Sequence, residues 1–397
     1  MARIKENIIK IMVFGTVLFL LYFLPQGNAY ALEPEEHKAE NVLILNSYHQ
    51  GFAWTQEETE GIMDKLKERG NNISFFVEYM DWKNHNSEEN LTYLYHYYKY
   101  KYQAQNIDII LATDDTALKF ALEYRKEMFS DAPVVFCGIN REGVKTITEG
   151  HDRVSGVIEV IDPTDTLKIA KSINPGITAV YLLNDNSESG KSTGQIMKEK
   201  IKEYDPGIRI IEWNHLTFAQ VKRSAEEVPQ GGIILLGTYF RDAVNNYLGI
   251  DYVTREISTV SSVPVYSVYD FGLNNGIVGG ALLSGRRQGE GAAEIAIRIL
   301  EGADPNQIPA DPADSSRIVF DYHQLQRFGI PAGVLPENSE ILNKPFSFYE
   351  TYKTLVLSVA AAFLVLILFV SILLFYIRMI RRMRNNLAES HEELTQL

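Results

Sequence analysis

Short apolar runs alternate with amphipathic stretches throughout residues 40–345. The runs are rich in branched side chains and apolar at successive positions, which is typical of strands buried on both faces of a parallel sheet. In the first half we expect strands at 41–45, 73–78, 107–112 and 133–137 and helices at 55–67, 88–102 and 115–124. In the second half we expect strands at 179–183, 208–212, 232–236 and 263–267 and helices at 187–204, 218–228 and 252–260. The pattern predicts an α/β protein with two doubly wound parallel-sheet lobes of similar size.

Two further extended apolar segments, 154–160 and 277–283, lie where the chain would cross between the lobes. The second leads into an amphipathic helix at 290–301, which needs a sheet of the first lobe to cover it. The predicted parts are lobe 1 (40–155 and 277–305), lobe 2 (156–276) and a C-terminal segment with linker (306–350). Two crossings make a hinge, and open parallel sheets bind ligands beyond the carboxyl ends of their strands. The pattern therefore predicts two lobes that close on a small molecule.

Two uncharged apolar stretches stand outside this pattern. Residues 1–31 join a basic start to the apolar run 11–24 and to Ala29-Tyr30-Ala31, which indicates either a cleaved signal peptide or an uncleaved anchor. Residues 355–377 carry no charge, and at about 1.5 Å per residue they can cross a bilayer core of about 30 Å. We expect a transmembrane helix there, in a cell-membrane protein that crosses once, or twice if the anchor stays.

Glu350 and Lys353 precede this span. The basic residues that follow it are Arg378, Arg381, Arg382 and Arg384. The positive-inside rule then places the C-terminus in the cytoplasm and residues 32–352 outside. Beyond the span, alternating spacings of three and four relate Ile380, Met383, Leu387, Ser390, Leu394 and Leu397. This heptad pattern in 378–397 fits either a short polar helix on the membrane or the start of a coiled-coil linker, which would join two copies and lead to an output domain.

The acidic residues number 51 and the basic residues 38. Both ends of the chain are net basic, so the acidity belongs to the exported part, and a surface of that sign disfavours nucleic acid as a partner. Cys137 is the single cysteine, which excludes an internal disulfide framework and any multi-cysteine metal site. We expect it to be a buried strand residue rather than a reactive thiol, because nothing basic lies beside it in the sequence.

Segments spread over residues 40–345 carry a family resemblance. They are Asn46-Ser47-Tyr48 with Trp54, Ala112-Thr113-Asp114-Asp115, residues 134–140, Gly156-Val157-Ile158-Glu159, Asp270-Phe271-Gly272 with residues 276–280, and Phe320-Asp321-Tyr322 with Phe328-Gly329-Ile330. In this order they resemble the extracytoplasmic substrate-binding proteins of ABC transporters, with a type I periplasmic-binding-protein fold, in the branch of aromatic amino-acid binders. The resemblance implies a small-molecule ligand. The chain departs from it in having no lipobox cysteine and in carrying a C-terminal span, an arrangement that resembles bacterial membrane sensors.

The loops after the first-lobe strands should line the ligand cleft. Ser47, Tyr48 and Trp54 offer a hydroxyl, a phenol and a flat apolar surface that can stack on a ring or hold an ammonium group; alternatively Trp54 fastens the following helix to the sheet. Asp114 and Asp115 follow the third strand, where one of them could bind a ligand amine and the other could cap the helix. Gly138 and Asn140 follow the fourth strand and offer amide groups, or simply form a turn.

In the second lobe the strands end at Asp185, at Tyr239 with Arg241, and at Asp270 with Phe271. Arg241 could bind a ligand carboxylate through its planar fork or pair with a neighbouring acid. The family resemblance adds weight to Asp270 and Phe271 as ligand contacts.

Several catalytic patterns are missing from the sequence. Ser189-Gly190-Lys191-Ser192 ends like a P-loop, but Asp185 stands where the first glycine belongs. The eight histidines form no zinc motif, and no G-x-S-x-G or S-x-x-K occurs. We therefore expect a binding protein without enzyme activity, metal or cofactor. The leading hypothesis is a sensor for an aromatic or amino-acid-like ligand; the alternative is a tethered receptor that serves an ABC permease.

Overall fold

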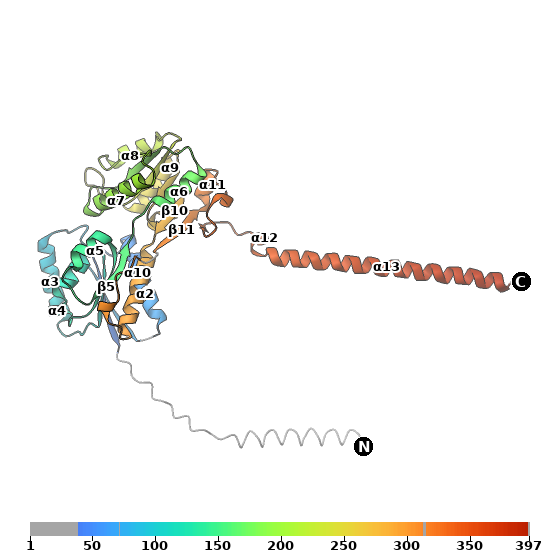
Figure 1. The fold of residues 1–397 in the computed structure, drawn as a ribbon, viewed down its shortest axis with the longest axis horizontal. Coiled ribbons are helices and arrows are strands. Elements are labelled where there is room, and N and C mark those ends of the chain that lie inside the picture. The colour runs from blue at the N-terminus through green and yellow to red at the C-terminus, as the bar shows by residue number, and fades with distance from the viewer. Residues whose placement is uncertain (1–38, 71, 313–314, 396–397) are drawn as a thin grey trace, which may run out of the picture. The chain divides into compact units, whose positions relative to one another are not determined.

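The computed structural model describes residues 39–70, 72–312 and 315–395. Two compact units make up the chain (Figure 1). Unit 1 runs up to Val160 and adds Ser284–Ser315, and unit 2 comprises Ile161–Leu283 and the residues from Ser316 onward. The expected signal or anchor at 1–31 lies outside the described residues.

Unit 1 is built on a five-stranded parallel sheet with the order β2-β1-β3-β4-β5. Its strands are β1 (Glu40–Asn46), β2 (Ile73–Tyr79), β3 (Ile109–Thr113), β4 (Val134–Asn140) and β5 (Val154–Glu159). Its helices are α2 (Ala53–Glu68), α3 (Glu88–Tyr102), α4 (Asp114–Met128), α5 (Arg141–Thr148) and α10 (Gly285–Leu300), followed by the 3-10 turn η2 (Pro305–Gln307).

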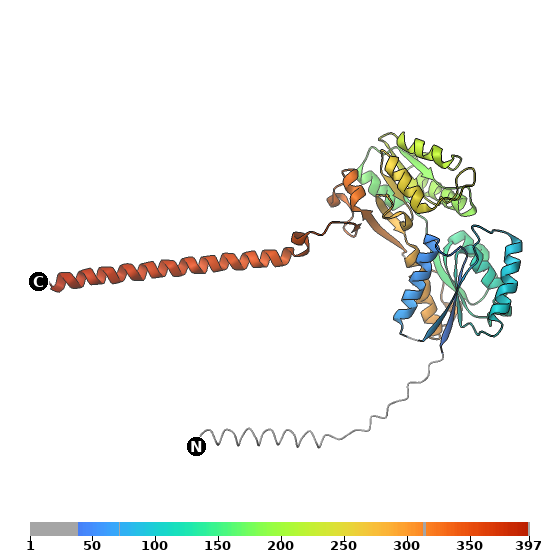
Figure 2. The same ribbon diagram turned by 180° about the vertical axis from the view of Figure 1, so that it is seen from behind.

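Helices cover both faces of this sheet because side chains alternate between the faces along each strand. Val42 and Ile44 point into a core shared with α2 and α10, whereas Leu43 and Leu45 point into a core shared with α3, α4 and α5. Figure 2 shows α2 in blue beside α10 in orange on one face. A Cβ atom on Gly289 of α10 would lie less than 3.0 Å from the backbone oxygen of Glu58. The missing side chain thus lets α10 approach the middle of α2.

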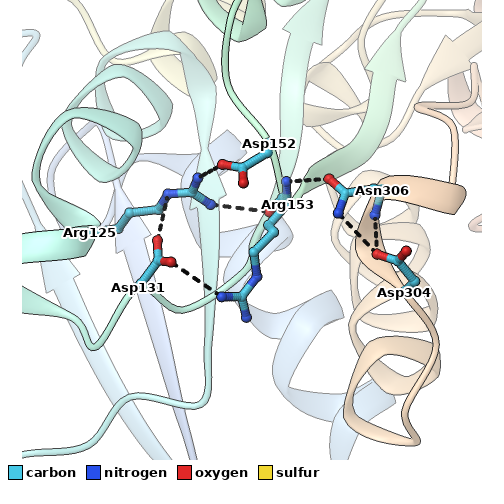
Figure 3. Close-up of polar contacts among 6 residues, drawn as sticks. All are labelled: Arg125, Asp131, Asp152, Arg153, Asp304 and Asn306. Carbon is cyan, nitrogen blue, oxygen red and sulfur yellow. Dashed lines mark hydrogen bonds and ion pairs between the residues drawn. The ribbon is translucent and has the colours of Figure 1, made fainter.

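A buried guanidinium ties together the edge of the sheet where β4 and β5 begin. Arg125, at the end of α4, is 1% exposed and donates to Asp152 Oδ1 at 2.6 Å; its Nε lies 3.5 Å from Asp131 Oδ1. The backbone N–H of Arg153 donates to Asn306 Oδ1 at 2.7 Å, so the contacts reach the segment after α10 (Figure 3). These polar groups form hydrogen bonds and ion pairs with one another. They lie at the edge of the sheet where the strands begin, opposite the edge at which the strand carboxyl ends meet.

Unit 2 contains a seven-stranded sheet with the order β12-β11-β10-β9-β8-β6-β7, in which only the β10–β11 pair is antiparallel. Its strands are β6 (Ala179–Leu183), β7 (Arg209–Glu212), β8 (Gly232–Leu236), β9 (Val265–Ser267), β10 (Gly279–Leu283), β11 (Ser316–Asp321) and β12 (Glu340–Leu342). Its helices are α6 (Thr164–Ile173), α7 (Glu188–Tyr204), α8 (Phe218–Glu226), α9 (Ile250–Val260), α11 (Tyr322–Arg327) and α12 (Phe348–Thr351), with the 3-10 turns η1 (Asp270–Gly272) and η3 (Ala332–Val334). The two α/β lobes with parallel sheets confirm the predicted fold class.

The division of the chain differs from the expected one at both crossings. Residues 156–160 were expected in lobe 2, but they belong to unit 1, where β5 (Val154–Glu159) pairs with β4. Residues 277–305 were expected in lobe 1, but β10 hydrogen-bonds with β9 and β11 and so lies in the sheet of unit 2. The unit boundaries fall after Val160, Leu283 and Ser315. An extended apolar segment can join either sheet, and only its hydrogen-bonding partners decide between them.

The C-terminal helix α13 (Lys353–Thr395) contains the expected membrane span. Its part Lys353–Ala388 is the one helix of the described residues that is long and apolar enough to cross a bilayer. Large apolar side chains are exposed along it, for example Leu364 at 68% and Phe369 at 63%. Apolar surface of this extent is typical of a helix whose natural surroundings are lipid.

Candidate ligand-binding site

The carboxyl ends of β1, β3, β4 and β5 bring several sequence-predicted residues to one edge of unit 1. Ser47 follows β1 and is fully buried. Its hydroxyl donates to the Thr113 carbonyl at 2.7 Å and accepts from the Ala117 N–H at 2.8 Å. Both partners belong to the β3–α4 junction, so Ser47 joins this junction to β1 and holds the loop that begins with Tyr48 in place.

Tyr48 lies half-buried in that loop, and its ring meets the ring of Phe52 edge-on at a centroid distance of 5.2 Å. The ammonium nitrogen of Lys83, from the loop between β2 and α3, lies 4.1 Å from the Tyr48 ring centroid. It also lies 5.1 Å from the ring centroid of Phe52. Both distances are within the range of cation–π attraction, so this pair of rings holds a positive charge.

Trp54 and Asp114 meet next to these rings. Trp54 is 5% exposed on α2, and its side chain hydrogen-bonds to the Asp114 carboxyl group. Asp114 is 4% exposed, begins α4 with φ at +63°, and keeps one carboxyl oxygen, Oδ2, without a hydrogen-bond partner. A non-glycine residue in the left-handed region is costly and is often found at functional sites. Trp54 therefore fastens the first turn of α2 to Asp114, and its role as a ligand contact stays a prediction.

Glu58 is a functional candidate that the sequence reasoning missed. It is completely buried on α2, and neither of its carboxyl oxygens has a nitrogen or oxygen hydrogen-bond partner. Burial raises the pKa of Glu58 well above its usual range, and the neighbouring Asp114 and Glu159 raise it further, whereas a hydrogen bond from the Cys137 thiol lowers it. The signal in the sequence is an acid at the i+4 position from Trp54 and the i−4 position from Ile62, on the apolar face of a helix.

Acidic groups surround the phenol of Tyr48. Burial raises the Tyr48 pKa, followed by the charges of Asp114, Asp115, Glu58 and Glu159. Burial also raises the pKa of Asp114, whereas the Lys83 charge lowers it. Cys137 is 1% exposed, as expected, and burial and the nearby Glu58 raise its pKa. The site is therefore suited to positive charge and to hydrogen-bond donors.

Gly138 lies directly against the two buried acids, Glu58 and Asp114. It lies at a register shift between β4 and β5 and has φ at +74°, and its N–H donates to Gln288 of α10 at 3.1 Å. A Cβ atom there would lie less than 3.0 Å from Glu58 Oε1 and 2.9 Å from Asp114 Oδ1. Only glycine leaves room for both carboxyl groups at this position.

The remaining lobe 1 candidates lie beside this centre. The Asn140 side chain caps α5 by accepting from the Gly143 N–H at 3.0 Å, which is the turn role that the sequence left open. Asp115 is half-buried on α4. Its charge acts on both Tyr48 and Asp114. Thr113 is the N-cap residue of α4.

Asp185, Tyr239 and Arg241 lie together in unit 2. Asp185 is buried and accepts from the backbone N–H groups of Ser187 at 3.0 Å and Phe240 at 2.7 Å. Tyr239 is 1% exposed, and its hydroxyl has no hydrogen-bond partner. Arg241 donates to the Asn245 carbonyl at 3.4 Å. Asp185 thus holds the loop after β6 and the loop after β8 together.

Asp270 and Phe271 form the short turn η1 in the same unit. The carboxyl group of Asp270 lies 3.4 Å from Nη2 of Arg317, a partner on β11 that the sequence reasoning did not foresee. Phe271 stacks on Tyr269 at a centroid distance of 5.0 Å. Among the residues that the structure describes, no three acidic, histidine or cysteine side chains are grouped to hold a metal ion.

Comparison with known proteins adds the evolutionary context. Residues 53–346 match the profile of a family described as ABC transporter substrate binding protein. No curated protein sequence matches the chain.

Solved structures share the fold. A conserved domain protein from Vibrio cholerae has a TM-score of 0.57 at 17% identity, over 77% of this chain and 99% of its own. An ABC domain in complex with L-Trp from Streptococcus pneumonia has a TM-score of 0.56 at 17% identity, over 77% and 100%. A ligand-free, open substrate binding protein with adhesive properties from Clostridium difficile has a TM-score of 0.57 at 15% identity, over 77% and 100%.

Proposed function

The chain belongs to the ABC transporter substrate binding protein family, and we propose that it is a membrane-anchored receptor that binds a small organic molecule outside the cell. The observation that carries the proposal is the group of Tyr48, Trp54, Glu58 and Asp114 at the carboxyl ends of the unit 1 strands. Buried carboxyl oxygens without nitrogen or oxygen partners at such an edge are typical of a ligand-binding site rather than a structural core. Binding without catalysis is the role that we propose.

We propose an aromatic or amino-acid-like ligand. The aromatic side chains Tyr48, Phe52 and Trp54 support a ring, and the acidic groups beside them support an amine. The L-Trp held by one protein of similar fold agrees with this ligand class. From unit 2, Asp185, Tyr239, Arg241, Asp270 and Phe271 remain proposed contacts.

Thermal unfolding of the detergent-solubilised full chain with L-tryptophan, L-tyrosine, L-phenylalanine and the matching aromatic acids tests the proposal. A ligand at about 100 times its Kd adds roughly 2.7 kcal/mol of stability. Tyr48→Ala should abolish the shift, whereas Tyr93→Ala should leave it unchanged, because Tyr93 is 66% exposed on α3. A shift that persists in Tyr48→Ala would place binding elsewhere, and no shift with any compound would contradict the ligand class.

We further propose that the protein is a sensor, in which closure of the two lobes on the ligand changes the helix α13 that leads into the cytoplasm. To move such an equilibrium appreciably, the ligand must favour the closed state by several kcal/mol. Disulfide crosslinking of Val356→Cys in membranes, with and without ligand, measures whether two copies of α13 change their spacing. An unchanged crosslinking yield with bound ligand would contradict signalling and leave binding intact.

A tethered receptor for ABC uptake is the second candidate, and the family description favours it. It predicts that deleting the gene stops cellular uptake of the ligand. A sensor predicts normal uptake and a lost response to the ligand. Measuring the uptake of labelled ligand in the deletion strain therefore separates the two roles.

A further inference from the structure

The Lys83 side chain occupies a position that would suit a ligand. We propose that the rings of Tyr48 and Phe52, with the carboxyl groups of Asp114 and Glu58, form a subsite for an organic ammonium group, which Lys83 fills in this structure as an internal competitor. The inference rests on the proposed ligand-binding function and deepens it. In this role Lys83 competes with the ligand for the subsite and does not contact the ligand.

A cation already lies on the rings of Tyr48 and Phe52. The Lys83 nitrogen lies 4.1 Å and 5.1 Å from the ring centroids of Tyr48 and Phe52, and the two rings meet edge-on at 71°. This geometry offers the nitrogen two ring surfaces, which attract ammonium groups through their quadrupoles. A ligand ammonium would find the same two surfaces.

The carboxyl groups beside the rings outnumber the cation. Burial, Asp115 and Glu159 raise the pKa of Asp114, whereas the Lys83 charge lowers it. Glu58 is 0% exposed with two carboxyl oxygens that have no nitrogen or oxygen partner, and Asp114 has one more such oxygen. One lysine charge therefore leaves acceptor capacity that an ammonium group with several N–H donors could use.

The surroundings of the subsite favour an organic cation over a metal ion. No three ligating side chains in the described part of the chain are grouped for a metal ion, and aromatic rings are poor partners for strongly hydrated metal cations. An organic ammonium combines apolar surface with N–H donors and fits both halves of the subsite. A ligand that carries a carboxylate and no amine would bring no cation to the rings and no N–H donor to the Asp114 carboxyl group.

The Lys83 side chain can leave the two rings. Its loop is fastened by the Trp82 N–H, which donates to the Ser47 carbonyl at 2.9 Å, and by Asn84, which donates to Asp81 at 2.7 Å. The backbone is thus held while the lysine side chain has four rotatable bonds that can swing the ammonium group into water. Exchange of one ammonium for another then needs no movement of the sheet.

Chemical rescue tests the subsite without knowledge of the natural ligand. The melting temperature of Lys83→Ala in the full-length chain is measured in propylammonium chloride and in sodium chloride of equal concentration. We expect propylammonium to raise the melting temperature of Lys83→Ala by several degrees more than sodium does, and to have no such effect on the native chain or on Lys119→Ala. Lys119 is an exposed lysine on α4. Equal responses to both salts, or an equal rise in the native chain, would overturn the proposal.

A second measurement uses Lys83→Gln, which keeps the length of the side chain and removes the charge. We expect tryptamine to bind Lys83→Gln roughly five- to tenfold more tightly than the native chain, because its ammonium group no longer competes with a lysine. Weaker binding of tryptamine to Lys83→Gln would overturn the competitor role. Indole-3-propionate, which lacks an amine, should bind more weakly than tryptamine to both proteins.

The two measurements separate this inference from the proposed function. Rescue by propylammonium without binding of any aromatic compound supports the subsite and contradicts the ligand class. Binding of aromatic ligands without rescue, and with weaker tryptamine binding in Lys83→Gln, supports the function and overturns the role of Lys83.

Discussion

Gly138 leaves the space that the buried carboxyl group of Glu58 fills. A Cβ atom at position 138 would lie less than 3.0 Å from Glu58 Oε1, and the backbone φ of +74° is itself unfavourable for any other residue. The strand bulge on β4 and the acid on α2 therefore depend on one another.

Gly138→Ala should lower the free energy of unfolding of unit 1 by about 2 to 4 kcal/mol, because it combines backbone strain with overpacking. Urea unfolding followed by tryptophan fluorescence measures this. Gly150→Ala is the matched control, because Gly150 has φ at +78° with nothing within 4 Å of its Cβ position. The difference between the two variants reports the contact with Glu58. Equal losses would contradict the contact, and adding Glu58→Ala to Gly138→Ala should recover part of the loss.

Glu58→Gln should flatten the dependence of stability on pH. Burial raises the pKa of Glu58 in the folded protein, so the folded state binds the proton more tightly than the unfolded state, in which the pKa is about 4.3. Stability should fall as the pH rises from that value through the raised one, by up to about 1.4 kcal/mol per pH unit. Glu58→Gln removes this loss and should be the more stable protein at pH 8. Urea midpoints between pH 4 and pH 8 measure the slope.

The control for this slope is Glu149→Gln, which changes an exposed acid on the same unit. It should follow the native curve. If Glu58→Gln also followed the native curve, ionisation of Glu58 in the folded protein would cost little free energy. Groups other than those in contact with Glu58 would then have to stabilise its buried charge.

Arg125→Met should destabilise unit 1 by about 2 to 3 kcal/mol, as measured by urea unfolding. The variant loses the buried ion pairs of Arg125 with Asp131 and Asp152, although both carboxylates can hydrate again. Asp152→Asn should have a much smaller effect, because the Asp152 side chain is 66% exposed. Ligand binding should be unchanged in both variants, since these residues lie at the opposite strand edge. A loss of affinity in Arg125→Met at temperatures where it is folded would show coupling between the two edges.

Cysteine labelling tests the proposed orientation of α13. In intact cells, a membrane-impermeant maleimide should label Glu337→Cys and fail to label Asn386→Cys; after lysis it should label both. Background from the native thiol should be low because Cys137 is 1% exposed. Labelling of Asn386→Cys in intact cells would reverse the topology derived from the basic residues after the span.

Hydrophobic periodicity located most elements well, since burial on both faces leaves a local trace in the sequence. Strands 179–183 and 232–236 and helix 88–102 have the predicted bounds. Helix α10 begins at Gly285 rather than at the predicted 290. Gly285, Gly289 and Gly291 weaken the helical signal, and in the case of Gly289 the glycine allows close contact with α2.

The candidate site could be predicted in part for the same reason. Tyr48, Trp54 and Asp114 come after parallel strands and Gly138 lies near the end of one, and the carboxyl ends of such strands share one edge of a sheet. Glu58 could not be predicted by this rule, because it lies inside a helix. Lys83 does lie in the loop after the parallel strand β2, but a single lysine in a loop gives no sign in the sequence of the rings that it contacts.

Local patterns along the chain thus determined the α/β elements, the long apolar C-terminal helix and the strand-end residues of unit 1, because each depends on the order of apolar and polar side chains. Tertiary structure alone decided which sheet takes β10, and it alone brought Glu58 against Gly138 and Lys83 onto Tyr48 and Phe52. Hydrogen bonds between strands, packing between helices and charge in a buried site are interactions across space between residues far apart in sequence. No spacing along the chain records them.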